Sequence, residues 1–381
     1  MKCLSEKCEI TLLTLYESQE QLDYLPLLRK YCAKIEAVLR RSDKSRLLRN
    51  LNIVTNPFFL SRPFHAVNYY SRKFEKILQR LVDSKKFDIV QIGFLHMAQY
   101  IRSIPSEIPV LLDTNNAEHL IIHRYFEAEK NLLKKFYLLY QREKLKGYEK
   151  KMCRRFDRCL TVSEKDKEEL AFVCDEKAFF SVIPNGVDVE YYTPRFFQDG
   201  YCTDLIHHGT MSGYMNVDAI IYFYEDILPY IRREIPDVKL TIAGANPDKK
   251  LLNLANIDKN VVVTGAVDDM RPYVAGSKVV IVPLRIGGGT RLKIPEAMAQ
   301  GRPVVSTSVG CEGLEVTPDK DIIVADDPKE FANRTVELLK DEGLRLRIGL
   351  NGRKLAETKY DWKIIVKELY SVYQEVVKGR K

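Results

Sequence analysis

Residues 285–303, RIGGGTRLKIPEAMAQGRP, combine glycines, cations and a carboxylate in a pattern suited to an anionic ligand. The three glycines Gly287–Gly289 lack a Cβ, so their backbone amides can approach a ligand closely. Arg291 and Lys293 add two positive charges at the start of a predicted helix, where unpaired amides also attract anions. This combination predicts a diphosphate site. The same spacing also fits a tight glycine turn that carries a surface Arg and Lys.

A carboxylate and a second glycine loop extend this candidate site. Glu296 follows on the predicted helix, which ends near Gly301, and its side chain is suited to accept hydrogen bonds from sugar hydroxyls. A second glycine-containing segment, residues 207–220 (HHGTMSGYMNVDAI), joins a predicted strand to a predicted helix, where phosphate loops occur. It departs from the GxGxxG pattern, so by itself it is a weak indication.

Short apolar runs that alternate with helical stretches predict the elements that would position these residues. The runs are rich in β-branched residues, which is typical of buried strands. They fall into two series: residues 9–15, 88–93, 110–114, 159–163 and 180–185, and then 205–210, 239–245, 261–265, 279–284, 303–307 and 321–326. Strand–helix alternation of this kind indicates parallel sheets with crossover helices, so we expect two doubly wound α/β domains.

The junction between the two domains is predicted near residues 186–200, which carry turn residues and show neither a helical nor a strand period. In open α/β sheets a ligand binds beyond the carboxyl ends of the strands. Two such domains that face each other would therefore form a ligand cleft between them.

Length and composition describe an ordinary globular chain of about two domains. Of the 381 residues 45% are hydrophobic and 29% charged, and no apolar run reaches the roughly 18 residues that cross a bilayer. Glu6, Lys7 and Glu9 interrupt the N-terminal stretch, so no signal peptide is predicted. The eight cysteines show no CxxC pair and no metal-ligand spacing, which favours reduced thiols in a cytoplasmic protein.

The net charge of +8 is concentrated in the first half of the chain. Residues 1–200 hold 34 Lys and Arg against 27 Asp and Glu. A basic half suits an anionic membrane surface or an acidic substrate, and it is equally compatible with a plain solvated surface. The basic residues form no dense block, so we expect no nucleic-acid partner.

Residues 124–158 form a long run of helical character with a predicted break at Gly147. The run mixes basic residues with aromatic ones, among them Phe126, Phe136, Tyr137 and Tyr140. An amphipathic helix that covers the sheet of the first domain is the simpler interpretation. A helix that lies on a membrane surface is the alternative.

The segment GGGTRLKIPEAMAQGRPVVSTSVGCEGL (287–314) closely resembles the donor-binding segment of retaining GT-B glycosyltransferases of family 4, in the subgroup that carries GGGTRLK. Other segments resemble the family in the expected order: VSEKDKEEL (162–170), VIPNGVDVEYYTP (182–194), GTMSGYMNVDAIIYFYEDILPYI (209–231), GAVDDMRPYVAGSKVVIVPL (265–284) and YDWKIIVKELYSVYQEV (360–376). The resemblance covers nearly the whole chain, and segment 287–314 is its most specific part.

The resemblance implies a GT-B fold, in which two Rossmann-like domains face each other across a cleft. It implies an acceptor-side domain over residues 1–190, a donor domain over 201–357, and a terminal helix over 360–381 that crosses back to the first domain. It also implies transfer of a sugar from a UDP- or GDP-sugar with retention at the anomeric carbon. The acceptor would be a glycan or a lipid-linked sugar, in the synthesis of a cell-surface polysaccharide or glycolipid.

The resemblance assigns donor binding to residues of the two glycine loops and the helix that follows the second: Gly209, Thr210, Gly288, Gly289, Thr290, Arg291, Lys293 and Glu296. Within this set Glu296 would bind the ribose, while Arg291 and Lys293 would hold the diphosphate. The Val267 backbone would lie near the base. Because fixed donors and cations would stabilise the leaving diphosphate, no metal or other cofactor is expected.

Three positions depart from the common family pattern. The first of two glutamates eight residues apart would fall at Gly288, where this chain has no carboxylate. The segment 209–216 lacks the Arg and Lys of many relatives, which shifts phosphate binding onto Arg291 and Lys293. The segment DTNNAEH (113–119) places Asn115 where the family usually has an active-site histidine, and Asn cannot act as an acid or base at neutral pH.

Other side chains of this segment remain as acceptor-side groups, namely Asn116, Glu118 and His119. The candidate catalytic residues are therefore Asn115, His119, Arg291 and Glu296. A lone histidine such as His119 is more often structural than catalytic.

The resemblance also predicts a shortened first domain. Family members begin with a strand, a glycine-rich loop and a helix before the segment that matches residues 5–15, and these elements are missing here. A parallel sheet without a central strand would expose strand edges.

The leading hypothesis is a cytoplasmic glycosyltransferase, placed peripherally at the inner face of the membrane where its acceptor is lipid-linked. A sugar-nucleotide epimerase or a phosphorylase on the same fold is a second enzyme hypothesis, although nothing marks the pyridoxal lysine of a phosphorylase. A degenerate nucleotide-sugar-binding protein without turnover is the third. Asn115 and the shortened first domain favour that last alternative.

Overall fold

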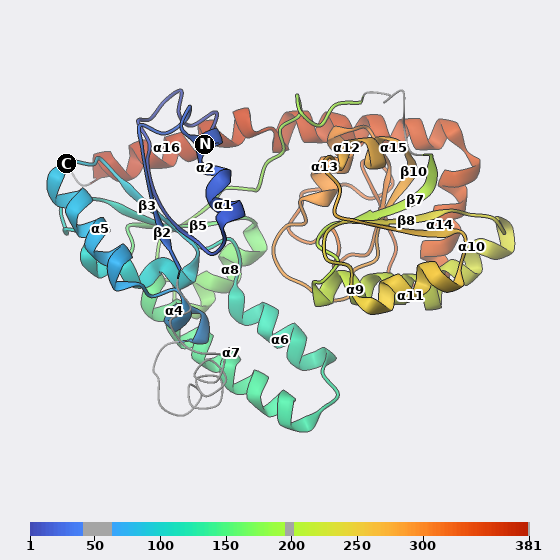
Figure 1. The fold of residues 1–381 in the computed structure, drawn as a ribbon, viewed down its shortest axis with the longest axis horizontal. Coiled ribbons are helices and arrows are strands. Elements are labelled where there is room, and N and C mark those ends of the chain that lie inside the picture. The colour runs from blue at the N-terminus through green and yellow to red at the C-terminus, as the bar shows by residue number, and fades with distance from the viewer. Residues whose placement is uncertain (41–62, 195–201, 380–381) are drawn as a thin grey trace. The chain divides into compact units, whose positions relative to one another are not determined.

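The computed structural model describes residues 1–40, 63–194 and 202–379 (Figure 1). The chain divides into two compact units. Unit 1 comprises Met1–Ile183 and Val366–Lys381, and unit 2 comprises Pro184–Ile365. Part of the predicted domain junction, residues 195–200, lies outside the described residues.

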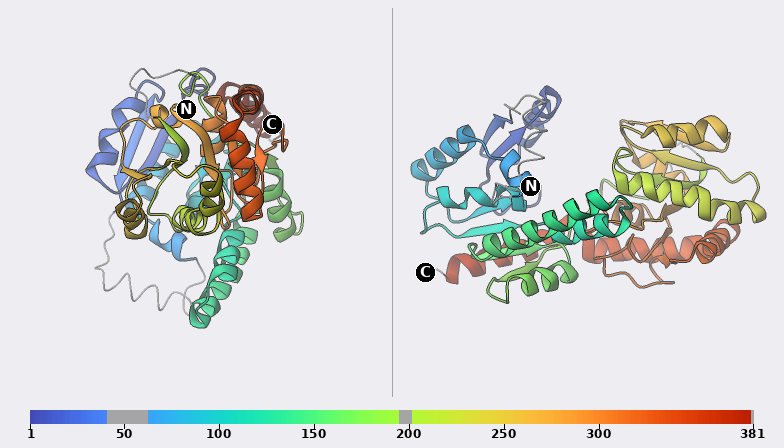
Figure 2. Two further views of the ribbon diagram at one scale, coloured as in Figure 1. Left: turned by 90° about the vertical axis from the view of Figure 1, so that its right-hand side faces the viewer. Right: turned by 90° about the horizontal axis from the view of Figure 1, so that it is seen from below.

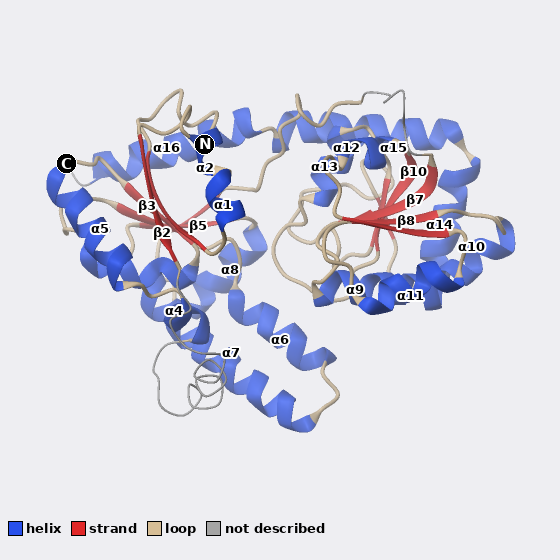
Figure 3. Ribbon diagram, in the orientation of Figure 1, coloured by secondary structure: helices blue, strands red, loops and turns tan. Residues whose placement is uncertain are grey.

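Unit 1 contains two parallel sheets, whose strands are red in Figure 3. In the first sheet, β1 (Thr11–Tyr16) pairs with β2 (Lys34–Leu39). The second sheet has the order β3-β4-β5-β6, with β3 (Val90–Gly93), β4 (Val110–Asp113), β5 (Arg158–Thr161) and β6 (Phe180–Val182). Among the described residues no backbone pairing joins the two sheets, so β1 and β3 each keep one unpaired edge.

Serine side chains cap the start of several helices in unit 1. The Ser71 hydroxyl accepts from the Phe74 amide at the start of α5 (Arg72–Ser84), and Ser163 caps α8 (Glu164–Val173) in the same way. The remaining elements are α1 (Gln19–Asp23), α2 (Leu25–Leu28), α4 (Phe64–Asn68) and the 3₁₀ segment η1 (Leu95–Ser103).

The predicted long helix of residues 124–158 is two helices, α6 (Glu118–Ala128) and α7 (Leu132–Cys153). The predicted break at Gly147 is wrong, because Gly147 lies inside α7 with open space around it. The break falls at residues 129–131, where the Asn131 side chain accepts from the Lys134 amide and starts α7. The two helices form a hairpin that extends from the sheets of unit 1 (Figures 1 and 2).

The core of unit 1 forms on both sides of its second sheet. Leu112 of β4 packs with Leu95, Leu145 and Met152 on one side. Residues that point the other way pack against the last helix, α16 (Trp362–Gly379): Leu111 and Leu160 with Tyr373 and Val376. Residues of α16 from Val366 onward thus belong to unit 1, although they follow all of unit 2 in the sequence.

Unit 2 is built on one parallel sheet of six strands in the order β12-β11-β10-β7-β8-β9. The strands are β7 (Thr203–His208), β8 (Leu240–Ala243), β9 (Val261–Gly265), β10 (Ser277–Val282), β11 (Val304–Ser306) and β12 (Ile323–Val324). In β10, Val279 and Ile281 enter one core cluster and Val280 and Val282 enter another. Helices therefore cover both faces of this sheet, as its continuous apolar strands require.

The helices of unit 2 are α9 (Tyr214–Tyr222), α10 (Leu228–Glu234), α11 (Lys249–Ile257), α12 (Arg271–Ala275), α13 (Lys293–Ala299), α14 (Pro328–Lys340) and α15 (Glu342–Leu355). A π-helical turn, η2 (Phe223–Ile227), joins α9 to α10, and a second, η3 (Ala356–Tyr360), follows α15. Asp327 caps α14 through the amides of Lys329 and Glu330.

The predicted α/β class with parallel sheets is confirmed. The strands lie where the apolar runs place them, with ends shifted by a few residues. The exception is β2, KIEAVL, which no predicted run covers because Lys34 and Glu36 interrupt its apolar residues. In the described part of the chain no helix is both long and apolar enough to cross a bilayer, and all eight cysteines are free thiols.

Candidate functional site

Two loops of unit 2 meet because the strands before them are neighbours. β7 ends at His208 and leads into Gly209, and β10 ends at Val282 and leads toward the glycines 287–289 and α13. β7 and β10 pair in parallel, so their carboxyl ends lie at the same edge of the sheet. A Cβ at Gly209 would lie 3.4 Å from the Lys293 Nζ, which shows that the two predicted loops are in contact.

The Gly209 loop is also packed against the end of the next strand. Gly209 and Gly244 have φ angles of +140° and +149°, which side chains rarely adopt. A Cβ at Gly244 would lie 1.7 Å from the Gly209 carbonyl oxygen. The Gly209 amide donates to the Ala243 carbonyl at 3.0 Å. The path of this loop therefore requires glycine at position 244, because a Cβ there would collide with the Gly209 carbonyl.

Lys293 is the partly buried cation of the site. Its Nζ donates to the Asn216 Oδ1 at 2.8 Å and to the His207 Nε2 at 2.9 Å. The Asn216 amide is oriented by its Nδ2, which donates to the Thr210 carbonyl at 2.9 Å. The His207 Nδ1 lies 2.9 Å from the Ile281 carbonyl, so Nδ1 carries the proton and Nε2 accepts. Two neutral acceptors thus hold the ammonium group without neutralising it.

The pKa values at this position follow from burial and like charge. Burial and the Arg291 charge lower the pKa of Lys293 to about 7, although the Glu296 charge opposes both. Burial and the Lys293 charge together hold the pKa of His207 well below its ordinary value. The next residue, His208, has a pKa lowered to about 3 by burial and by Lys293. Both histidines are therefore neutral near pH 7.

Arg291 turns back onto the glycine loop that precedes it. Its Nη1 donates to the carbonyls of Gly288 and Gly289, and the residue is only 9% exposed. A Cβ at Gly287 would meet the Arg291 Nη2 at 2.2 Å, so the guanidinium fits only because Gly287 has no side chain. Arg291 thus holds the loop in shape while its charge stays next to Lys293.

Glu296 lies in the first turn of α13, half-buried beside the segment that precedes β7. Its Oε1 accepts from the Tyr192 hydroxyl at 3.2 Å, and its Oε2 has no hydrogen bond within the described residues. Burial raises the pKa of the Glu296 carboxyl, while the Tyr192 hydrogen bond and Lys293 lower it. In the same region the Asn185 Nδ2 donates to the Thr290 Oγ1 at 3.0 Å.

The other predicted donor residues lie at the same edge of the sheet. Thr210 is exposed directly after Gly209, and Val267 lies two residues beyond the end of β9 at Gly265. The structure therefore brings together the two glycine loops, Lys293 and Glu296 in one region of unit 2. In the described ranges no group of three or more His, Cys, Asp or Glu side chains is arranged to hold a metal ion.

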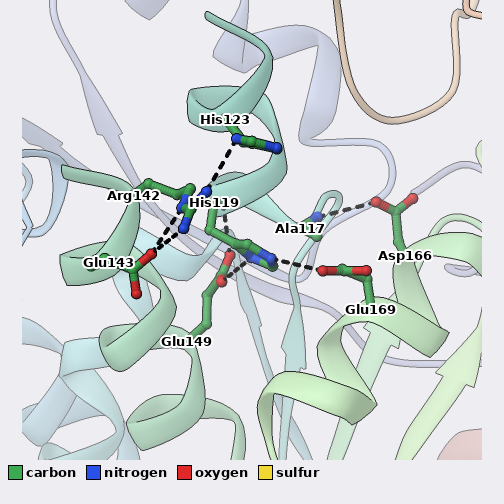
Figure 4. Close-up of polar contacts among 8 residues, drawn as sticks. All are labelled: Ala117, His119, His123, Arg142, Glu143, Glu149, Asp166 and Glu169. Atoms are coloured by element: carbon green, nitrogen blue, oxygen red, sulfur yellow. Dashed lines mark hydrogen bonds and ion pairs between the residues drawn. The ribbon is translucent and has the colours of Figure 1, made fainter. Parts of the chain in front are cut away.

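A second polar cluster lies in unit 1 at the start of α6 (Figure 4). The His119 Nδ1 lies 2.5 Å from the Glu149 Oε2 of α7, and its Nε2 lies 3.1 Å from the Glu169 Oε1 of α8. Burial opposes a charge on His119, but the two carboxylates outweigh it and raise the pKa of the ring. Both ring nitrogens are thus occupied by carboxylates in a residue that is 3% exposed.

The loop that leads to this cluster follows β4. Asn115 has a left-handed backbone with φ of 59°, and the Ala117 amide donates to the Asp166 Oδ1 at 3.1 Å. Burial and the nearby Glu149 raise the pKa of Glu118 to about 7. Asn115 and Glu118 both lie at the carboxyl end of the sheet of unit 1, the edge at which ligands bind in such sheets.

Sequence reasoning missed the groups that support the predicted residues. Four such groups contact predicted donor residues that lie 77 to 105 positions away in the sequence, namely His207, Asn216, Asn185 and Tyr192. One local indication is His207, a polar residue that directly follows the apolar residues Leu205 and Ile206 in β7. Such a residue marks a buried polar contact without naming its partner.

Two protein-family models match successive parts of this chain. Residues 29–191 match the model described as Glycosyltransferase Family 4. Residues 203–341 match the model described as Glycosyl transferases group 1, which spans the two glycine loops, Lys293 and Glu296.

Two curated relatives are bacterial proteins. An uncharacterized 44.6 kDa protein in the cps region of Klebsiella pneumoniae is 25% identical over 305 residues, which is 77% of this chain and 76% of that protein. The capsular polysaccharide biosynthesis glycosyltransferase CapM of Staphylococcus aureus is 32% identical over 149 residues, which is 37% of this chain and 39% of CapM.

Solved structures of low sequence identity share the fold over nearly the whole chain. Sucrose-phosphate synthase from Thermosynechococcus elongatus has a TM-score of 0.68 at 15% identity, and the match covers 97% of this chain and 99% of that one. Anabaena HepE in complex with UDP-glucose has a TM-score of 0.64 at 13% identity, covering 96% and 99%. The two family models and this shared fold show that the chain belongs to the GT-B glycosyltransferases.

Proposed function

We propose that the protein transfers a sugar from a nucleoside diphosphate sugar to a glycan or lipid-linked acceptor, with retention at the anomeric carbon. The donor would bind at the loops of unit 2 around Gly209 and residues 287–291. The names of the relatives in capsule synthesis and the UDP-glucose bound to HepE support this proposal. The product would be a cell-surface polysaccharide or glycolipid.

The observation that carries the proposal is the placement of Lys293. Its ammonium group lies against the glycine loop of Gly209, and within the described residues its hydrogen-bond acceptors are neutral. A partly buried cation without an anionic partner is costly, and an anionic ligand would remove that cost. A diphosphate leaving group gains charge in the transition state, so a fixed cation there stabilises the transition state more than the ground state.

The remaining donor residues take roles that follow from their contacts. The amides of Gly209, Thr210 and Gly288–Thr290 would approach the phosphates, and Arg291 would keep its loop in shape and add charge. The free Oε2 of Glu296 would accept from the ribose hydroxyls while Tyr192 holds Oε1. The Val267 backbone would lie near the base.

On the acceptor side, we infer different roles for the two candidate residues of unit 1. His119 has no ring nitrogen left for a substrate, so we assign it a positioning role that fixes the start of α6. Asn115 remains a candidate for hydrogen bonding to substrate. Glu118, with a pKa raised to about 7, is the nearby group able to exchange a proton near neutral pH.

The direct test is calorimetry of the full chain with UDP-, GDP- and other nucleoside diphosphate sugars, followed by assays for nucleoside diphosphate release. We expect the protein to bind nucleotide sugars of one base only. Release of the nucleoside diphosphate should depend on an acceptor. The product should show by NMR the same anomeric configuration as the donor. Failure of every nucleotide sugar and nucleoside diphosphate to bind would refute the proposal.

The structure also favours a second candidate, a nucleotide-sugar-binding protein without turnover. Asn115 cannot act as an acid or base, and His119 is committed to two glutamates. This candidate predicts donor binding with no release of nucleoside diphosphate under any acceptor. An epimerase on the same fold would instead convert the sugar nucleotide with no acceptor present, so assays with and without acceptor separate the three.

A further inference from the structure

The tip of the α6–α7 hairpin carries large apolar side chains in contact with solvent. Leu132, Leu133 and Phe136 are 80%, 83% and 76% exposed. No other large apolar side chain of the described residues is as exposed as these three. Single exposed apolar residues are common, but three such neighbours at one tip indicate an interaction surface.

These residues lie on the side of α7 that faces away from unit 1. Positions 132, 133 and 136 share one side of a helix. The buried residues of α7 recur on the opposite side: Gln141, Leu145, Tyr148, Glu149 and Met152. The helix is therefore apolar on two sides, and packing within unit 1 explains only one of them.

Basic residues surround the apolar tip. Lys130, Lys134 and Lys135 lie within six residues of one another, and the Lys134 side chain is 71% exposed at 3.9 Å from the Glu129 carboxylate. Across its 22 residues α7 has seven Lys and Arg against two Glu. Long lysine side chains can lie along an apolar surface while their ammonium groups reach an anionic layer. The tip thus combines exposed apolar side chains with neighbouring lysines.

We propose that this tip, residues 130–136, docks on an anionic lipid bilayer. Leu132, Leu133 and Phe136 enter the boundary between headgroups and acyl chains, and the three lysines contact anionic headgroups. A protein partner fits less well, because a stable protein interface buries about 800 Å² on each side, far more than a helix tip presents. The proposal rests on unit 1 alone and stands independently of the donor site in unit 2.

The test is co-flotation of the full chain with vesicles of phosphatidylcholine alone and with about one third phosphatidylglycerol, an anionic lipid. Three multiple variants are compared with the wild type. The apolar variant is Leu132→Ser, Leu133→Ser and Phe136→Ser, and the charge variant is Lys130→Gln, Lys134→Gln and Lys135→Gln. The matched control replaces three exposed apolar residues of unit 2, Ile257→Ser, Leu346→Ser and Leu350→Ser.

We expect the wild type and the control to bind the anionic vesicles and to bind phosphatidylcholine weakly. The apolar and charge variants should each lose about tenfold in vesicle binding, because a short apolar tip and a basic cluster are both needed for stable attachment. Nucleotide-sugar binding by the same variants serves as the check on folding and should not change.

A second experiment measures insertion directly. A Phe136→Trp chain should be quenched by lipids brominated on their acyl chains, while Trp362 of the parent chain should not. The proposal is overturned if the wild type binds no anionic vesicles or if the apolar variant binds them as well as the wild type. It is equally overturned if the apolar variant abolishes self-association in sedimentation velocity and leaves vesicle binding unchanged, since the tip would then contact a second copy.

Discussion

The Lys293 ammonium lies 2.9 Å from the His207 Nε2, and the lysine charge adds to burial in lowering the pKa of that ring. The lysine charge holds His207 neutral, and the neutral ring offers a lone pair that accepts from the lysine. The contact joins the last residues of β7 to the first residue of α13. The glycine loop proposed to bind phosphate is thereby tied to a cation whose hydrogen-bond acceptors, within the described residues, are neutral.

The first prediction concerns the pH dependence of donor affinity. The pKa of Lys293 without ligand is about 7, and a bound diphosphate raises it. Below pH 7 the lysine is already charged, so affinity is constant. Above pH 7 binding must add a proton, and the affinity should fall by about tenfold per pH unit until the pKa of the complex is reached. Titration with an intact nucleotide sugar measures this, since it has no terminal phosphate that titrates.

Variants of the same group supply the control for this pH profile. Lys293→Met should bind weakly at every pH and lose the inflection near pH 7, whereas Lys278→Met, at an exposed position, should resemble the wild type. Asn216→Ala removes one acceptor of the charged form, so its inflection should move to lower pH. An unchanged pH profile in Lys293→Met would show that the lysine does not meet the donor.

The second prediction concerns the pair of Glu296 and Tyr192. Glu296→Ala should weaken donor binding by about 1–3 kcal/mol, the typical cost of losing a charged hydrogen bond. Tyr192→Phe should cost less, and the double variant should cost less than the sum, because the Tyr192 hydroxyl acts through Glu296. Calorimetry at one pH measures all three. The neighbouring Tyr191→Phe is the control, and additive effects would show that the two groups act separately.

The third prediction uses the contact between two glycines. Gly244→Ala should displace the Gly209 loop, because the new Cβ would lie 1.7 Å from the Gly209 carbonyl oxygen. We expect donor binding to fall by at least about tenfold and the melting temperature to drop. Gly213→Ala is the matched change, since its Cβ would meet only the Thr210 carbonyl at 3.5 Å. Thermal unfolding and donor titration of both variants test this prediction. Equal melting temperatures and equal donor affinities in the two variants would show that Gly244 does not constrain the Gly209 loop.

The fourth prediction concerns the buried ion pairs of His119. His119→Ala leaves the Glu149 side chain, 1% exposed, without its partner and should cost about 3 kcal/mol of unfolding free energy. The pKa of His119 is raised, so its stabilising effect is full below the ordinary histidine pKa and fades as pH rises through the raised value. The difference from the wild type in urea unfolding should therefore shrink at alkaline pH.

His123→Ala tests whether this effect is specific to the buried histidine. His123 lies one turn along the same helix, and its side chain is 36% exposed beside Glu127. We expect a loss within about 0.5 kcal/mol, as for other surface pairs. Equal losses in the two variants would mean that the Glu149 and Glu169 contacts do not account for the result.

The fold was largely predictable because its strands are buried on both faces. Runs such as VVIVPL (279–284) are apolar at every position, so they stand out without any pairing information. β2 was not predicted because Lys34 and Glu36 reduce its apolar signal. The helix break was misplaced at Gly147, because glycine is tolerated inside a long helix, whereas the actual start of α7 depends on the cap at Asn131.

The candidate site was predictable only in part. The glycine loops, Lys293 and Glu296 stand out from their types and their local order. Their supporting contacts do not, because His207 and Lys293 are 86 residues apart and meet only through the pairing of β7 with β10. The direction of Arg291 was also invisible in the sequence, since it depends on the space left by Gly287.

Unit 1 is built from both ends of the chain, and this affects the order in which the two units can fold during synthesis. Tyr373 and Val376 of α16 pack on Leu111 and Leu160, so the first unit to leave the ribosome is completed by residues synthesised after the whole of unit 2. Until then the apolar face beneath α16 stays uncovered, which favours chaperone binding during translation. A chain stalled before residue 366 should hold a folded unit 2 and a unit 1 that remains sensitive to protease.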